Sequence, residues 1–227
     1  MKTNKKTAMI VGVLFIIGTV SGVLSNFFMG SIVDDPEYLV KFSENSSQII
    51  IGALLALIMA FVLAMVPVVL YPIFRQQNEA LALGAVVFRG ALEAIAYIGI
   101  VISWLLLISL SQEYMGAGTS ETLNFQIIGT MLHNVGYWSS QMVSIVFSIG
   151  ALFIYSIFYQ TKLIPRWLSV WGLIGALIYI TCPLFAMFGH NIEILMAPLA
   201  LQEMVLAVWL IVKGFNFTHM TSDLKMK

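Results

Sequence analysis

Three ionisable residues lie inside strongly apolar segments, where a charge is energetically costly. Arg89 and Glu93 belong to the run Phe88-Arg89-Gly90-Ala91-Leu92-Glu93, and Glu203 belongs to Leu201-Gln202-Glu203-Met204. A charge at the centre of a membrane-spanning helix costs roughly 2.5 to 3.5 kcal/mol, so such side chains face the interior of a helix bundle and pair with one another. These three residues are therefore candidates for a buried ionic network, which would hold a proton or bind a polar ligand.

Helix geometry predicts which of these residues meet. Arg89 lies ten residues after Glu79, and Glu203 lies ten residues before Lys213. Glu79 and Lys213 are expected at the same membrane face, so both buried side chains lie about 15 Å from that face, at 1.5 Å per residue. This shared depth predicts a bridge between Arg89 and Glu203. Glu93 follows Arg89 by four residues and lies on the same helix face.

The charges of this group do not balance. One arginine that faces two carboxylates leaves an excess negative charge, which apolar surroundings disfavour. We therefore expect one of the two carboxyl groups, Glu93 or Glu203, to keep a proton. Two interpretations remain open, because such a group can respond to a ligand or a proton, or can simply lock two helices together.

A second polar pattern follows one face of another apolar segment. Its members fall at spacings of four, four, three and four residues, which predicts one stripe along a helix. The stripe is His133, Tyr137, Gln141, Ser144 and Ser148. It is either a seam of hydrogen bonds between helices or the wall of a polar cavity. We group its first three residues with Arg89, Glu93 and Glu203 as a candidate ligand-binding or buried polar network.

Other chemistries have little support in the sequence. The chain has three histidines, and none has the close His or Glu spacing that is typical of a metal site. Its single cysteine, Cys182, lies in an apolar run and is expected to pack in the core. We therefore expect no cofactor and no metal, and we assign no catalytic residue.

The composition is that of a protein whose solvent is lipid. Apolar residues make up 60% of the 227 positions and charged residues 10%, whereas a soluble domain has roughly 45 to 50% and about 25%. Nucleic acid is not an expected partner at a net charge of zero. Membrane lipid is the expected partner, with a small molecule or lipid as the candidate ligand.

Six apolar runs are long enough to cross a bilayer, which takes about 20 residues each. The sequence therefore predicts an all-α fold, a single six-helix transmembrane domain over residues 1–227. The runs are Ala8 to Phe28, Ile49 to Tyr71, Leu81 to Leu110, Ile127 to Tyr159, Trp167 to Phe188 and Ile194 to Val212. The first run is expected to be a retained span, because it is longer than the apolar region of a signal peptide.

The basic residues predict how the chain is oriented. Positively charged loops stay on the cytoplasmic side of a membrane, and six spans leave Lys41 alone on the opposite side from ten other basic residues. Those ten are Lys2, Lys5, Lys6, Arg75, Arg89, Lys162, Arg166, Lys213, Lys225 and Lys227. We therefore expect a multi-pass protein of the plasma membrane with both termini in the cytoplasm.

Several of these features together resemble one known family. They are Phe88-Arg89 with Glu93, the run Leu163-Ile164-Pro165-Arg166-Trp167-Leu168, and Glu203 followed by Trp209-Leu210-Ile211-Val212-Lys213-Gly214. The pattern is similar to the bacterial membrane proteins grouped as domain of unknown function 4386. The resemblance covers nearly the whole chain. It implies a six-helix membrane protein, and it supplies no activity and no catalytic residue.

Three classes of function remain open. A binding or transport module would use a cavity between the third, fourth and sixth spans for a small or lipidic ligand. An intramembrane enzyme would use Glu93, Glu203 or His133 as acid and base, and would need a cleft that water can reach. A structural or partner-binding subunit would need neither. We favour a role without catalysis.

The orientation can be tested with reporter fusions. Reporters placed after Gln76, Lys162 and Lys227 are expected to read cytoplasmic, because the basic loops hold those positions inside. Reporters placed within residues 34–44 or 115–119 are expected to read external. One loop on the opposite side would rule out six spans.

Overall fold

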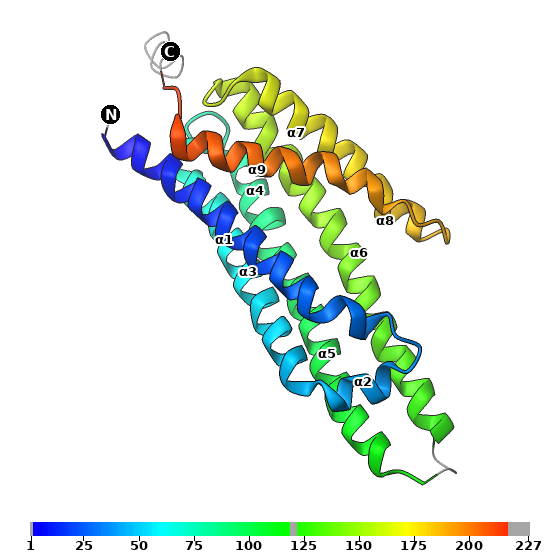
Figure 1. The fold of residues 1–227 in the computed structure, drawn as a ribbon. Helices are drawn as coiled ribbons and strands as arrows, with labels where there is room; N and C mark the ends of the chain where they lie inside the picture. The colour runs from blue at the N-terminus through cyan, green and yellow to red at the C-terminus, as the bar shows by residue number, and fades with distance from the viewer. Residues whose placement is uncertain (1, 119–121, 218–227) are drawn as a thin grey trace. The chain divides into compact units, whose positions relative to one another are not determined.

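The computed structural model describes residues 2–118 and 122–217, and in these ranges all regular structure is helical. Lys225 and Lys227, which contribute to the predicted orientation, lie outside the described residues, as does the Lys2 side chain. The elements are α1 Lys2–Val33, α2 Tyr38–Glu44, α3 Ser46–Phe74, α4 Glu79–Ala85, the π-helix η1 Val86–Leu92, α5 Glu93–Gly116, α6 Thr122–Thr161, α7 Arg166–Tyr179, α8 Thr181–Ala186, the 3₁₀-helix η2 Glu193–Met196 and α9 Ala197–Val212 (Figure 1).

The six predicted spans are confirmed. Six helical stretches in the described ranges are long and apolar enough to cross a membrane, so the chain is a multi-pass membrane protein. The stretches are Lys5–Val33, Ser46–Phe74, Glu79–Gly116, Thr122–Thr161, Arg166–Ala186 and Glu193–Val212. The third consists of α4, η1 and α5, the fifth of α7 and α8, and the sixth of η2 and α9.

Two local features differ from what the sequence suggests. The first loop contains a short helix, α2, whose Leu39 and Phe42 are buried. Pro198 lies inside the predicted run Ile194 to Val212, but in the structure it stands in the first turn of α9. A proline is tolerated there because the first amide groups of a helix have no intrahelical acceptor, so α9 begins beside Pro198 instead of bending around it.

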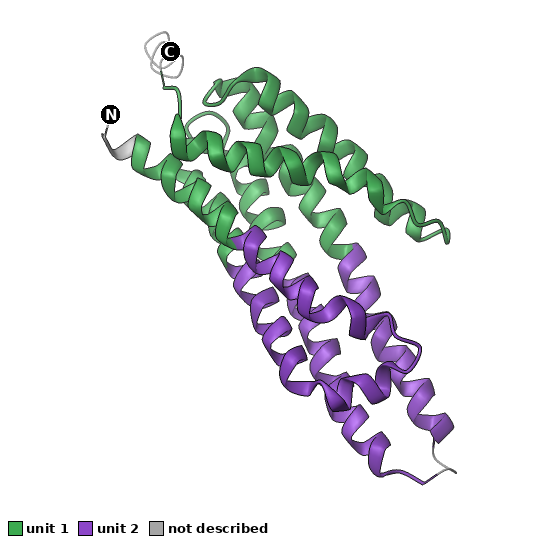
Figure 2. Cartoon of the chain, viewed as in Figure 1, with its two compact units in different colours: residues 1–17, 62–93, 142–227 green, residues 18–61, 94–141 purple. Residues whose placement is uncertain are grey.

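The described helices divide into two compact units (Figure 2). Unit 1 contains residues 1–17, 62–93 and 142–227, and unit 2 contains residues 18–61 and 94–141. The boundaries fall within α1, α3 and α6 and within α5, directly after its first residue, Glu93. Arg89, Glu93 and Glu203 all belong to unit 1, whereas His133, Tyr137 and Gln141 belong to unit 2.

Unit 1 brings several chain segments together at one of its ends. A Cβ atom at Gly214, just beyond α9, would lie 3.6 Å from Cγ of Lys5 at the start of α1. The backbone N–H of Asn216 donates to the carbonyl oxygen of Leu163, between α6 and α7, at 2.9 Å. The first turns of α1 and the segment after α9 therefore lie side by side, as an even number of spans requires.

The loops of this end carry most of the basic residues that the structure describes. Phe74 and Phe158, at the ends of α3 and α6, meet edge to face with ring centroids 5.1 Å apart, so the loops that follow these helices start close together. The basic residues on the segments gathered here are Lys5, Lys6, Arg75, Lys162, Arg166 and Lys213. The basic residues from which the orientation is predicted therefore also lie together in space, at one end of unit 1.

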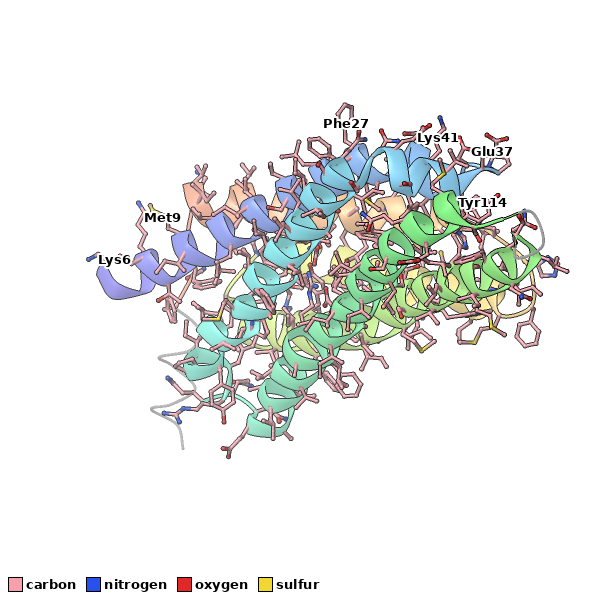
Figure 3. All side chains as sticks on the ribbon, turned by 90° about the horizontal axis from the view of Figure 1, so that it is seen from below. Lys6, Met9, Phe27, Glu37, Lys41 and Tyr114 are labelled. Atoms are coloured by element: carbon pink, nitrogen blue, oxygen red, sulfur yellow. The ribbon has the colours of Figure 1, made fainter. Side chains whose placement is uncertain are left out.

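Unit 2 has its own apolar core, to which the short helix α2 contributes. Phe42 of α2 is buried among residues of α1, α3 and α5, and Ser25 Oγ donates to the carbonyl oxygen of Gly52 at 2.8 Å. Phe27, Glu37 and Lys41 point away from the helices (Figure 3). An exposed phenylalanine is expected on a surface that faces lipid.

Candidate functional site

Arg89 lies in a π-helix within the third span. The π-helix η1 runs from Val86 to Leu92, between α4 and α5, and Arg89 is 2% exposed. Hydrogen bonds from residue i to i+5 widen a helix locally, and such stretches occur mostly as single turns that are frequent at functional sites. The apolar run that predicts the third span gives no signal for this change in helix geometry.

The bridge that helix depth predicts is present. Nη2 of Arg89 donates to Oε1 of Glu203 at 3.2 Å, and Oε2 of Glu203 lies at 3.5 Å from the same nitrogen. Nη1 of Arg89 donates to Oε1 of Glu93, one helical turn further along. The guanidinium also lies over the ring of Phe147 on α6, 4.3 Å from its centroid. Two carboxylates and a ring face therefore surround this cation.

The two carboxylates are not equally satisfied. Both oxygens of Glu203 lie near Arg89, but Oε2 of Glu93 is buried and has no hydrogen-bond partner among the described residues. The Glu93 side chain is 4% exposed. A buried acceptor without a partner costs about 1 to 3 kcal/mol, and more when it is charged. The cluster thus has one oxygen with unused capacity to accept a hydrogen bond.

Gly150 on α6 allows the close approach that places Arg89. A Cβ atom at Gly150 would lie 2.6 Å from the backbone nitrogen of Arg89 and 2.9 Å from its Cα atom. Backbone atoms cannot swing aside as the end of a side chain can. Only glycine therefore lets α6 pack directly against the π-helix, and this contact fixes where Arg89 enters the bundle.

A separate set of hydrogen bonds positions the helix that carries Glu203. The Tyr155 hydroxyl on α6 donates to Oε1 of Gln202 at 2.6 Å, and Nε2 of Gln202 donates to the carbonyl oxygen of Leu168 on α7 at 3.0 Å. Gln202 is fully buried. Because it precedes Glu203 on α9, these bonds orient the helix so that Glu203 faces Arg89.

Gln202 and Tyr155 are therefore positioning residues that the sequence interpretation missed. Gln202 did offer a signal, because an amide inside an apolar span needs a partner. Tyr155 offered none, since tyrosine is common in apolar runs. Gly172 on α7 packs against its ring, because a Cβ atom there would lie 2.6 Å from ring carbons.

The predicted polar stripe of α6 does not act as one set of contacts. Nε2 of His133 lies 3.2 Å from the carbonyl oxygen of Val33 at the end of α1, a contact between helices within unit 2. Tyr137 is 37% exposed and its ring meets Trp138. Gln141 is buried. These three residues remain candidates, but they belong to a different unit from Arg89.

The serines of the stripe belong to unit 1. Ser148 Oγ donates to the carbonyl oxygen of Ser144 at 2.7 Å, within its own helix. The Ser148 hydroxyl therefore donates within α6 and not to another helix, because a hydroxyl can bond to the carbonyl four residues earlier. Among the described residues no group of three His, Cys, Asp or Glu side chains could hold a metal ion.

A comparison with models of known protein families finds a match for most of the chain. The family model described as "Domain of unknown function (DUF4386)" matches residues 10–214. The chain belongs to the DUF4386 family. The matched residues include most of the first span, the other five spans in full, and Arg89, Glu93 and Glu203. The family description assigns no activity to these residues. No curated protein and no solved structure matches the chain.

Removing the arginine alone should harm the protein more than removing it together with its partner. Arg89→Ala leaves two buried carboxylates without a cation, and breaking a buried pair typically costs about 3 to 5 kcal/mol. The double variant Arg89→Ala with Glu203→Gln should recover about 0.5 to 3 kcal/mol of that loss. Thermal unfolding in detergent of the wild type, the two single variants and the double variant measures the coupling energy between Arg89 and Glu203. Additive losses would show that the two side chains are not coupled.

Two neighbouring glycines provide a matched test of the close approach. Gly150→Ala should destabilise the protein by about 1 to 3 kcal/mol, the usual cost of overpacking, because its new methyl group meets the Arg89 backbone. Gly90→Ala is the control, since a Cβ atom there lies 3.5 Å from the Ala64 carbonyl oxygen and 3.6 Å from Cγ of Pro67. Melting temperatures in detergent compare them. Equal effects would contradict the role of Gly150.

Proposed function

We propose that this membrane protein binds a small or lipidic ligand at a polar site within its helices, and that the cluster of Arg89, Glu93 and Glu203 is the polar part of that site. The observation that carries the proposal is the buried Oε2 of Glu93, which has no partner among the described residues. An acceptor in this position can receive a hydrogen bond that the protein itself does not supply. A ligand with a donor group would supply it.

The charges of the cluster support the same proposal. Arginine keeps its charge in proteins, so two ionised carboxylates would leave the cluster with a net negative charge. An ionised group in apolar surroundings is far more costly than a neutral one. The cluster would therefore bind either a proton or a ligand whose donor group is positively charged, and the two would compete for the same oxygen.

The two alternative functions use the same residues differently. An enzyme would need water and substrate to reach two titratable groups, which the 4% and 12% exposure of the Glu93 and Glu203 side chains disfavours. A structural bridge needs only the ion pairs, and it would not respond to protons near neutral pH.

We further propose that the protein resides in the plasma membrane with its basic loops in the cytoplasm. The proposal rests on the segregation of the basic residues to one side of the six spans.

Infrared difference spectroscopy separates the ligand site from the structural bridge. If one carboxyl keeps its proton, the purified protein should show a carboxylic-acid C=O band at pH 7, where an exposed glutamate is ionised. Glu93→Gln should remove this band, since the uncompensated oxygen belongs to Glu93. Glu113→Gln is the matched control, because Glu113 is an exposed glutamate on the same span.

Each outcome of this experiment decides between the two functions. A band that disappears in Glu93→Gln and remains in Glu113→Gln would support a proton-binding site. A spectrum with no protonated carboxyl at pH 7, from protein that carries no copurified ligand, would contradict the proposal and leave the cluster as a structural bridge. Lipids and metabolites that copurify with the gently extracted protein, and are absent from the Glu93→Gln variant, would identify the class of ligand.

A further inference from the structure

An open apolar groove runs along the outer face of α9. Its volume is about 420 Å³. It is lined by Met204, Val205, Val208, Trp209, Val212 and Lys213. Val208 and Val212 are 56% and 61% exposed, so this face of the helix is not covered by the other elements of unit 1. The groove is separate from the buried cluster, because Glu203 points to the opposite side of α9, toward Arg89.

The dimensions and chemistry of the groove suit a lipid chain. Positions 204 to 213 extend over roughly 14 Å of helix, within a segment apolar enough to cross a membrane. The lining is apolar along this length and ends at one ammonium group, on Lys213. A lysine at the end of a span extends its charged group toward the lipid headgroups while its methylenes remain in the apolar layer.

Aromatic residues mark the same end of α9 as the interface between hydrocarbon and headgroups. Trp209 meets Trp167 of α7 edge to face, with ring centroids 6.5 Å apart, and Trp167 lies 6.3 Å from Trp171. Tryptophan is enriched at the depth of the headgroups. A lipid whose chain lies beside Val208 would therefore have its phosphate near Lys213.

The charges at this end of unit 1 favour an anionic headgroup. Lys213 shares the end with Lys5, Lys162 and Arg166, whereas Glu79, the first residue of α4, is the one acidic residue on the described segments of this end. A basic residue beside a bound headgroup favours anionic lipid by about a factor of five in binding, and Lys213 is the basic residue that lines the groove. A zwitterionic headgroup carries its own cation and gains less from this surface.

We infer that the α9 groove binds an anionic phospholipid, with one acyl chain along Val205, Val208 and Val212 and the phosphate paired with the Lys213 ammonium. The inference goes beyond the proposed polar site and does not depend on it, because the groove is lined by Met204, Val205, Val208, Trp209, Val212 and Lys213 and by none of the three cluster residues.

Brominated lipids test this inference through Trp209, whose indole fluorescence bromine quenches on contact. The full chain would be reconstituted in phosphatidylcholine vesicles that contain a rising fraction of brominated phosphatidylglycerol or brominated phosphatidylcholine. Trp209→Phe identifies the part of the signal that belongs to the groove. The quenching that depends on Trp209 should saturate at a fraction of brominated phosphatidylglycerol that is about fivefold lower than the fraction of brominated phosphatidylcholine needed.

Variants at two lysines show whether the preference belongs to the groove. Lys213→Ala should abolish the preference for the anionic lipid while leaving quenching by the zwitterionic lipid unchanged, and Lys213→Arg should retain the preference. Lys162→Asn is the matched control, because Lys162 lies at the same end outside the groove and has a positive φ of 54° that asparagine tolerates. Equal quenching by both lipids, or an equal loss in Lys162→Asn, would overturn the inference and leave only general lipid contact.

Discussion

The cost of placing the Arg89 charge inside a membrane-spanning bundle constrains the rest of unit 1. A guanidinium cannot shed its proton, so the surrounding helices must compensate it. Glu93 contributes from the following turn, Glu203 from α9, and Phe147 from α6 offers the negative face of its ring. The third span, α6 and α9, which are far apart in the sequence, therefore meet at the Arg89 guanidinium. This contact sets the position of each of these helices along its axis.

The backbone adapts to this requirement as much as the side chains do. The π-helix η1 turns Arg89 into the bundle, and Gly150 lets α6 approach the Arg89 backbone. On the other side of α6, Tyr155 and Gln202 hold α9 in the rotation that aims Glu203 inward. A polar network in apolar surroundings is stable only when nearly every member is paired. These contacts explain why so little of the network is left unpaired.

The parts of this architecture that follow from sequence are those that depend on periodicity and depth. The six spans follow from the length of the apolar runs, and the Arg89–Glu203 bridge follows from the equal distances of these two residues from the same membrane face. The π-helix could not be predicted, because it is a choice between two hydrogen-bond registers that the same apolar residues satisfy. The division of the polar stripe could not be predicted either, since spacing places His133 and Ser148 on one face without saying which helices meet that face.

The unpaired oxygen of Glu93 is what distinguishes a binding site from a purely structural bridge. One carboxylate would suffice to compensate one arginine, and a buried pair of this kind is often no more stable than apolar residues of similar volume. A second carboxylate with an unused oxygen adds a cost of about 1 to 3 kcal/mol without adding a contact between helices, since Glu93 lies one turn from Arg89 in the same span. The excess carboxyl therefore contributes little to holding helices together, which is why we propose that it accepts a proton or a hydrogen-bond donor from outside the protein.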